Sequence, residues 1–341
     1  MRRTNLLLLT GLTLGLCSCS FGKGSGNSDS DSIFESDSSL SESESETESE
    51  KSDTGVTDPV ITSTSSSSSQ QSTPSSSSGI PEYDGYNLVW SDEFDGTQLD
   101  SSKWGYEIGN GNWGWGNGEL QYYTSNSRNS SVADGMLTIT AMKDQSMGNF
   151  NYTSARLTTS GKFSFAYGKI EARMSLPVSQ GMWPAFWLLP SVEGTNAYGG
   201  WPSSGEIDIM ERIMDQSKVD AGNDPTITSS AVHYYNNFGG NNYSIYQTNE
   251  NHALSSVRDW HVYGCEWTPD YIRTYIDTQT ILTVNRSTWA LLPGLQDTSA
   301  PFDKPFYILL NLAVGGRVAT PASDFVSDYM QVDYVRVYQA E

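Results

Sequence analysis

Positive charge is scarce in this chain of 341 residues, which has 19 Lys and Arg against 40 Asp and Glu and a formal net charge of −21. A surface that binds nucleic acid needs clustered Lys and Arg to neutralise phosphates, so the composition argues against a nucleic-acid-binding protein. Tryptophan (10) and tyrosine (19) are plentiful by contrast. They suit either an aromatic-rich β core or a surface that stacks against a neutral, polyhydroxylated ligand.

Cysteine is also rare. Of the three cysteines, Cys17 and Cys19 fall near the N-terminus and only Cys265 lies in the later chain. A disulfide inside a folded domain and a zinc site of four cysteines are therefore excluded. Cys265 follows an alternating stretch, and we expect it to be a small, buried apolar residue.

Long apolar runs are missing as well. The stretch Leu6–Leu16 follows a pair of arginines and has the length of an export signal, but it is too short to span a bilayer stably. The sequence Leu16-Cys17-Ser18-Cys19 resembles the lipobox of bacterial lipoproteins, which implies a signal peptide over residues 1–19 and a lipid on Cys19. We expect an exported lipoprotein that is anchored to a membrane or the cell surface, with an extracellular location as the alternative. An ordinary signal peptide with incidental cysteines is the alternative.

Residues 20–81 contain almost no aromatic side chains and are rich in serine and acidic residues. Runs such as Ser41–Glu46 cannot form a core, and their like charges keep the segment extended. We therefore expect residues 20–81 to be a disordered linker, followed by a folded domain over residues 82–341.

The expected domain consists of short alternating segments, rich in β-branched and aromatic residues and separated by clusters of Gly, Asn, Asp and Ser. No long stretch has the 3.6-residue period of a helix. The pattern predicts an all-β domain, and at this size a sandwich of two sheets. The predicted strands are Met136–Ala141, Lys169–Ser175, Thr226–Tyr234, Tyr271–Asp277, Phe306–Leu312 and Gln331–Tyr338.

The segment Gly205–Arg212 carries three acids in a strand-like pattern. Glu206 and Asp208 point to one face of a strand, and the isoleucines that alternate with them point to the other. The third acid, Glu211, arrives one position late. A β-bulge at Ile209–Met210 would add the missing residue and return Glu211 to the face of the other two acids.

Three carboxylates in a row on one strand are typical of glycoside hydrolysis. A retaining glycosidase needs two carboxyl groups about 5–5.5 Å apart, one to attack the anomeric carbon and one to protonate the leaving oxygen and then activate water. Glu206 and Glu211 suit these roles. Asp208 would hydrogen-bond to the nucleophile, and its charge would raise the pKa of a neighbour. A solvated acidic strand face and a calcium site are the alternatives.

The acidic strand is one of five segments that resemble glycoside hydrolase family 16, in its laminarinase-like (endo-β-1,3-glucanase) branch. The resemblance covers about Leu88–Gln339. It implies an all-β jelly-roll sandwich of two curved antiparallel sheets with a concave substrate cleft. The other four segments are Trp113–Thr124, Phe165–Arg173, Gly181–Pro190 and Val332–Tyr338.

The resemblance also implies roles for single residues. Glu206 matches the nucleophile, Asp208 the assisting acid and Glu211 the acid/base. The positions that match residues contacting or flanking the sugar are Asn117, Arg173, Trp183, Trp187, Trp201 and His233.

Three of the matching positions have a structural alternative. His233 is either a cleft residue near the acid/base or a satisfied core histidine. Glu171 is either a ligand of the substrate or the ion-pair partner of Arg173. We assign Arg156 to the framework.

The family often binds one structural calcium on the convex side, and the matching positions are Glu93 and Gly135 through backbone oxygens and Asp333 through its carboxylate. We expect no cofactor in catalysis itself. Two positions depart from the family pattern. Arg317 follows Gly315-Gly316 where an aromatic platform is common, and Arg212 stands where an aromatic residue is frequent.

The implied activity is endo-hydrolysis of a β-1,3-glucan by a monomeric enzyme, with mixed-linkage β-1,3-1,4-glucan as a second substrate. The alternatives are a relative that acts on another polysaccharide such as agarose, a non-catalytic β-glucan-binding lipoprotein, and a structural surface lipoprotein. Retention of all three acids weighs against the last two.

Overall fold

The computed structural model describes residues 79–191, 198–213, 226–236, 241–249, 254–289, 300–317 and 319–341. The predicted signal peptide, Cys19 and nearly all of the predicted linker lie outside these residues. Within them, no helix has the length and apolar character needed to cross a membrane.

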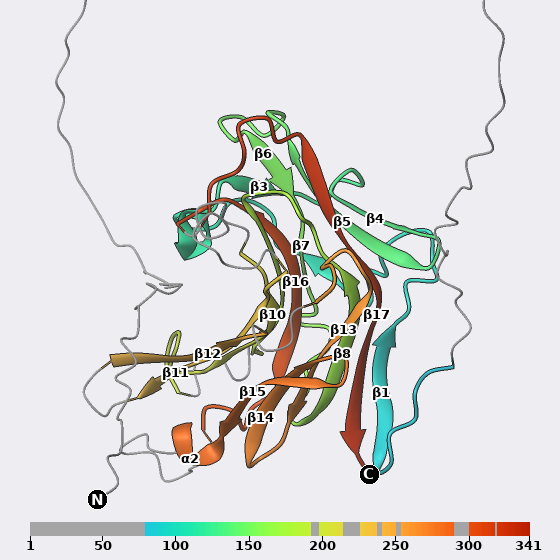
Figure 1. The fold of residues 1–341 in the computed structure, drawn as a ribbon, viewed down its shortest axis with the longest axis vertical. Helices are drawn as coiled ribbons and strands as arrows, with labels where there is room; N and C mark the ends of the chain where they lie inside the picture. Colours follow the sequence, from blue (N-terminus) through green and yellow to red (C-terminus); the bar gives the residue numbers. More distant parts are fainter. Residues whose placement is uncertain are drawn as a thin grey trace, which may run out of the picture. The chain divides into compact units, whose positions relative to one another are not determined.

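The described residues from Ile80 onward form two sheets, drawn as two curved layers in Figure 1. Sheet A has the strand order β15-β14-β13-β8-β17-β5-β6-β3, with β1 paired to β17 and β4 paired to β5. Its pairings are antiparallel except β3 with β6. The strands are β1 (Tyr86–Asp92), β3 (Gln121–Tyr123), β4 (Ser130–Ala133), β5 (Met136–Lys143), β6 (Tyr152–Ser154), β8 (Gly168–Ser175), β13 (His261–Trp267), β14 (Tyr271–Ile276), β15 (Gln279–Asn285) and β17 (Ser327–Ala340).

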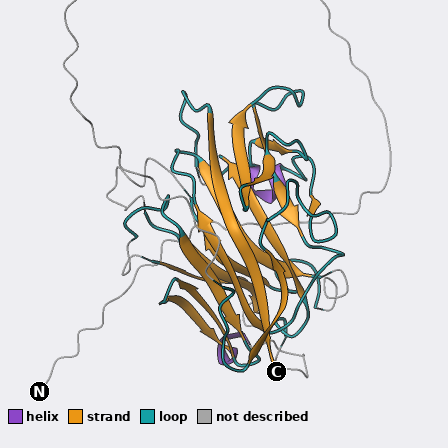
Figure 2. Ribbon diagram, turned by 90° about the vertical axis from the view of Figure 1, so that its right-hand side faces the viewer, coloured by secondary structure: helices purple, strands orange, loops and turns teal. Residues whose placement is uncertain are grey.

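Sheet B has the order β12-β11-β10-β9-β16-β7-β2. Helix is confined to two short segments of the described chain, the π-helix η1 (Gly114–Gly118) and α2 (Arg286–Trp289), as Figure 2 shows. The strands of sheet B are β2 (Gly105–Tyr106), β7 (Arg156–Thr158), β9 (Met182–Pro190), β10 (Glu206–Glu211), β11 (Ser229–Asn236), β12 (Asn241–Thr248) and β16 (Phe306–Val314).

The prediction of an all-β sandwich is confirmed, and each of the six predicted strands is present. The main difference is β17, which begins at Ser327 rather than Gln331. The added residues pair with β5 and alternate between exposed and buried positions. Their outward residues are a serine and a tyrosine, and an aspartate lies among their inward ones, so the alternation between polar and apolar residues is weak here.

The core lies between the sheets. Ile170, Ala172 and Met174 of β8 face it from sheet A, and Phe186 and Leu188 of β9 face it from sheet B. Burial of such side chains contributes about 1.5–3 kcal/mol each for the larger ones. The alternate residues of β9 therefore lie on the other face of sheet B, which is the concave side in Figure 1.

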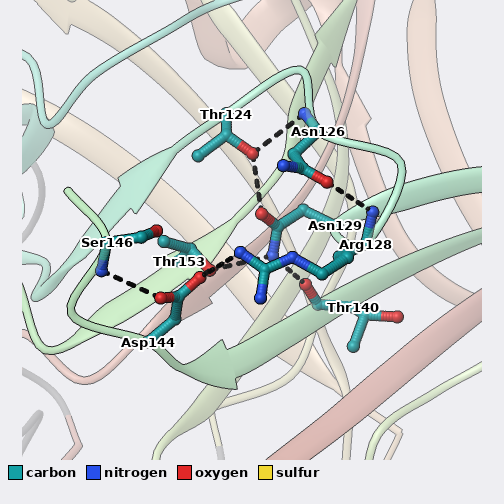
Figure 3. Close-up of polar contacts among 8 residues, drawn as sticks. All are labelled: Thr124, Asn126, Arg128, Asn129, Thr140, Asp144, Ser146 and Thr153. Atoms are coloured by element: carbon teal, nitrogen blue, oxygen red, sulfur yellow. Dashed lines mark hydrogen bonds and ion pairs between the residues drawn. The ribbon is translucent and has the colours of Figure 1, made fainter.

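A buried asparagine forms hydrogen bonds to three segments at the end of the sandwich that includes β3. Asn129 is 1% exposed, accepts a hydrogen bond from Thr124 Oγ1 (2.7 Å), and donates to the carbonyl of Thr140 (3.0 Å) and to Thr153 Oγ1 (3.1 Å), as drawn in Figure 3. Its amide thus links the β3–β4 connection to β5 and β6.

We expect Asn129→Ala to lower the free energy of unfolding by about 2–3 kcal/mol, because the buried amide makes three hydrogen bonds that alanine cannot make. Arg128→Ala is the matched control. That side chain is 55% exposed and pairs with Asp144 at the surface, so its loss should cost less than about 1 kcal/mol. Urea unfolding of both variants checks the difference, and equal losses would contradict it.

Candidate active site

The three acids lie on β10, where the predicted bulge is confirmed. Against β9, Asp208 lies opposite Trp187 and Met210 lies opposite Phe186, which leaves Ile209 as the extra residue. The two isoleucines and the methionine of β10 all belong to the core between the sheets. The acids consequently share the opposite, concave face of sheet B.

Gly205 determines how the chain enters β10. Its φ is +87°, and a Cβ atom at this position would lie 2.8 Å from a ring carbon of Phe302. Any side chain would strain the backbone and clash with a buried ring. Glycine therefore allows the strand to begin directly at Glu206.

Two indole groups orient the outer acids. Trp201 Nε1 donates a hydrogen bond to Glu206 Oε2 (2.7 Å), and Trp183 Nε1 donates to Glu211 Oε1 (2.9 Å). An indole N–H is only a donor, so each of these oxygens must act as an acceptor. The second oxygen of each glutamate remains for chemistry.

The middle acid pairs with a histidine from the neighbouring strand. His233 lies opposite Glu206 in the register of β10 and β11, and its Nε2 lies 2.8 Å from Oδ2 of Asp208. Both side chains are at most 4% exposed. The structure thus places His233 among the acids, as expected of a cleft residue.

Glu206, Asp208 and His233 are also the one group of acid, histidine or cysteine side chains in the described ranges whose ligand atoms lie close enough, within 4.8 Å, to hold a metal ion. Two carboxylates and an imidazole are a common ligand set. In this site the Trp201 N–H points at Glu206 and the imidazole contacts Asp208. These contacts hold the three side chains together through their own polar groups.

Burial controls the protonation of the acids. Burial raises the pKa of Glu206 to about 8, and the charge of Asp208 adds to the rise. Burial also raises the pKa of Asp208 well above its usual range, with a further contribution from Glu211. For Glu211 burial again raises the pKa, while His233 and the hydrogen bond from Trp183 oppose it. The pKa of each of the three acids is therefore raised, and carboxyl groups this close to one another titrate as a coupled set.

A chain of hydrogen bonds runs from Trp187, which lies opposite Asp208 in the register of β9 and β10, to the loop that contains η1. Trp187 Nε1 donates to Asn311 Oδ1 (2.7 Å), Asn311 Nδ2 donates to Tyr123 Oη (3.2 Å), and Tyr123 donates to Glu119 Oε2 (3.1 Å). The other oxygen of Glu119 accepts from Asn117 Nδ2 (3.3 Å). The loop residue Asn117 is thereby linked to the tryptophan that lies beside Asp208.

Arg156 belongs to this site, although the sequence assigned it to the framework. It lies on β7 of sheet B, and its guanidinium stacks 4.3 Å from the ring centre of Trp115 and 4.8 Å from that of Trp187. It also pairs with Glu107. In the sequence, Arg156 stands between apolar residues of a β segment, with no acidic residue nearby to pair with it. A lone arginine in such a segment is the signal that could have identified it as a residue of the site.

Arg173 was expected in the cleft, and the structure places it elsewhere. It lies on β8 of sheet A, between residues that face the core, so its side chain points away from sheet B. Its Nη1 pairs with Asp333 Oδ2 at 2.8 Å, and its guanidinium stacks 4.9 Å from the ring centre of Trp260. The motif predicted the strand correctly, but Arg173 does not lie with the acids.

Glu171 lies on the same outer face of sheet A, and it is not the ion-pair partner of Arg173, which pairs with Asp333 instead. Its carboxylate accepts hydrogen bonds from Tyr83 Oη (2.7 and 2.8 Å) and from Tyr275 Oη (2.6 Å). It therefore joins the start of the domain to β8 and β14.

The positions of the predicted calcium site are spread over sheet A and its turns. Asp333, the one predicted side-chain ligand, pairs with Arg173. The carboxylate of Glu93 pairs with Arg336 (2.7 Å). Gly135 has a φ of +72° in the turn between β4 and β5. The calcium site remains a prediction, because two of its expected ligands are backbone oxygens.

A family model described as the glycoside hydrolase family 16 domain of β-porphyranases A–D matches residues 86–340. The chain therefore belongs to glycoside hydrolase family 16. Its curated relatives include a β-glucanase of Rhodothermus marinus, which is 40% identical over 74% of this chain and 85% of its own length. Another is glucan endo-1,3-beta-glucosidase A1 of Niallia circulans, 38% identical over 76% of this chain. The chain spans 39% of that protein.

Solved structures of laminarinases share the fold. The catalytic domain of the Thermotoga maritima laminarinase is 37% identical, with a TM-score of 0.64 over 75% of this chain and 99% of that one. LamA of Zobellia galactanivorans, solved with laminaritriose and laminaritetraose, is 33% identical, with a TM-score of 0.62 over 74% and 98% of the two chains.

Glu206→Gln should make the protein more stable at pH 8, on the order of 2 kcal/mol, and leave it unchanged near pH 4.5. The folded protein binds the Glu206 proton more tightly than the unfolded chain does. Its stability therefore falls as the pH rises between those values, and the amide removes this loss while still accepting from Trp201.

Thermal and urea unfolding at the two pH values measure the effect. Glu82→Gln is the control, because Glu82 is exposed and stays hydrated in both states. If Glu206→Gln instead had a lower free energy of unfolding than the parent at pH 8, burial of the ionised Glu206 would not destabilise the fold, and the prediction would be wrong.

Proposed function

We propose that the protein is a retaining endo-glycosidase that hydrolyses β-1,3-glucan. The observation that carries the proposal is the pair Glu206 and Glu211 on one bulged strand, each with one oxygen held by an indole N–H. The endo-1,3-β-glucanase and laminarinase activities of the named relatives support the substrate.

In the proposed reaction, the free oxygen of Glu206 attacks the anomeric carbon and forms a covalent glycosyl-enzyme. Glu211 protonates the leaving glycosidic oxygen, then accepts a proton from the water that releases the sugar. Because Glu211 Oε1 accepts from Trp183, its transferable proton must lie on Oε2. The raised pKa of Glu211 supports its role as the acid.

Asp208 and His233 set the charge of the nucleophile. Burial raises the pKa of Asp208, and we propose that Asp208 therefore holds a proton in the active enzyme and donates it in a hydrogen bond to the ionised Glu206. His233 Nε2 lies 2.8 Å from Oδ2 of Asp208. We infer that the proton held by Asp208 allows Glu206 to ionise beside Glu211 without three negative charges gathering in a buried site.

The concave face of sheet B suits a neutral glucan. The rings of Trp115, Trp183, Trp187 and Trp201 accompany the acids, and the one buried cation among them, Arg156, is partly neutralised by Glu107. We propose that mixed-linkage β-1,3-1,4-glucan is a second substrate. A polysaccharide other than β-glucan, such as agarose, remains the alternative substrate. The matching family model supports this alternative, because it is named for porphyranases rather than for glucanases.

We further propose that the protein is exported and carries a lipid on Cys19, on the strength of the lipobox-like sequence alone. The linker would then hold the enzyme away from a membrane. A structural calcium at Glu93, Gly135 and Asp333 is proposed from the family resemblance, with Arg173 as the group that a calcium ion would have to displace from Asp333.

The purified protein should release short β-1,3-linked oligosaccharides from laminarin, with the β-anomer appearing first in NMR spectra recorded during the reaction. Glu206→Ser should abolish release and keep binding, because the variant loses the nucleophile but keeps the aromatic face. Parallel digests of lichenan and agarose define the substrate. Initial release of the α-anomer would contradict the retaining mechanism, and binding of laminarin by the parent protein without hydrolysis would indicate a binding protein instead.

The two arginines give a matched pair of variants. Arg156→Lys should lower kcat/KM on laminarin about tenfold, since lysine keeps the charge but loses the planar group between two indoles. Arg173→Lys should change kcat/KM less than twofold, because Arg173 lies on the other sheet. Thermal unfolding of both variants separates activity from folding. The opposite order of effects would place the substrate on sheet A.

A further inference from the structure

Trp113 is a large apolar side chain that the fold holds in solvent. It is 72% exposed, directly before η1, and its φ is +57°. The next residue, Gly114, has a φ of +61°, and a Cβ atom there would lie 2.4 Å from the backbone nitrogen of Glu119. The loop is therefore closed tightly on itself, and an exposed indole on it has little conformational freedom to lose on binding.

Arg317 completes a pair with this indole. Its guanidinium lies 4.3 Å from the ring centre of Trp113, and its backbone N–H donates to the carbonyl of Asn117 (2.9 Å). The side chain is exposed, and no carboxylate of the described residues forms an ion pair with it. The guanidinium covers one face of the indole, and the exposure of Trp113 shows that much of the rest of the ring is free.

A stack of side chains leads from β9, beside the acids, to the loop that carries Trp113. From Trp187, beside Asp208, the stack passes through Arg156 to Trp115, which lies two residues from Trp113 on the same loop. In Figure 1 this loop, with its short teal coil, lies at the end of sheet B away from the β11–β12 hairpin. Trp113 and Arg317 thus lie on the loop at which this stack ends.

We propose that Trp113 and Arg317 form an additional subsite that binds a neutral sugar ring of the polysaccharide at a distance from the cleaved bond. The free face of the indole would stack against the C–H face of the sugar. The guanidinium, which has five N–H donors and no acid partner, would donate to hydroxyl groups at the edge of that sugar. This inference rests on the proposed function, since it assigns the subsite to the same glucan chain.

The electrostatics favour a neutral sugar over an anionic one. The chain carries a net charge of −21, and the concave face holds the buried acids Glu206 and Asp208 together with the partly buried Glu211. A single exposed guanidinium in this field offers little net attraction to a sulfated or uronic polymer. Stacking and hydrogen bonding do not depend on that field. The subsite would therefore favour long neutral chains over short ones.

The test compares substrates by length. Trp113→Ala should lower kcat/KM on laminarin polymer about tenfold, in the range seen when an aromatic anchor is truncated. It should leave hydrolysis of short laminari-oligosaccharides unchanged, because these fill only the subsites near the acids. Trp113→Phe should restore part of the loss, and Arg317→Ala should reproduce part of it. Val326→Ala, at a residue equally exposed, is the control and should have no effect.

Binding of the same ligands in the Glu206→Gln background gives a second readout that does not depend on turnover, and Trp113→Ala should weaken it for the polymer alone. Equal loss on short and long substrates, or no loss on either, would overturn the subsite while the proposed activity stands. Failure of the parent protein to hydrolyse any laminari-oligosaccharide would overturn the proposed function and this subsite with it.

Discussion

The extra residue at Ile209 is the constraint on which the site depends. A regular strand with this sequence would place Met210 on the concave face and Glu211 in the core. Both errors are costly, because an apolar side chain would be exposed and a carboxylate would be buried without a partner. The bulge avoids both at once, and it leaves Asp208 and Met210 in register with β9. Core packing and catalytic geometry are thus determined by the same local backbone feature.

Burial raises the pKa of these acids, which suits them to proton transfer, and it also makes their ionised forms unfavourable for folding. Three carboxylates in so little space raise one another's pKa, and the groups that compensate are few: two indole N–H donors and the imidazole of His233. Each donor comes from a different segment, namely β9, the loop before β10, and β11. The site therefore forms only when the long-range pairings of sheet B are complete, and the cost is met by the rest of the fold.

The strand of acids was predictable from the sequence because its signal is local. Alternation, its single interruption and the apolar residues on the opposite face all lie within eight positions. Arg156 and Arg173 show where such reasoning fails. Both have apolar neighbours on either side in the sequence, and local pattern alone does not say which sheet a strand joins. That depends on pairing partners, and Arg156 reaches the site because β7 pairs with β16, more than a hundred residues later in the chain.

The same limit applies to the loop residues. Glu119 and Tyr123 stand in a recognisable motif, but their contact with Trp187 passes through Asn311, which is 188 positions from Tyr123. A family motif identifies such residues without saying what they support. The chain-specific features carry more information about this protein. Arg317, noticed in the sequence only as a missing aromatic, lies over an exposed indole that a different segment supplies. When a residue expected from a family motif is missing, as the aromatic residue is at Arg317, its replacement therefore has to be interpreted together with the side chains that contact it in the folded protein.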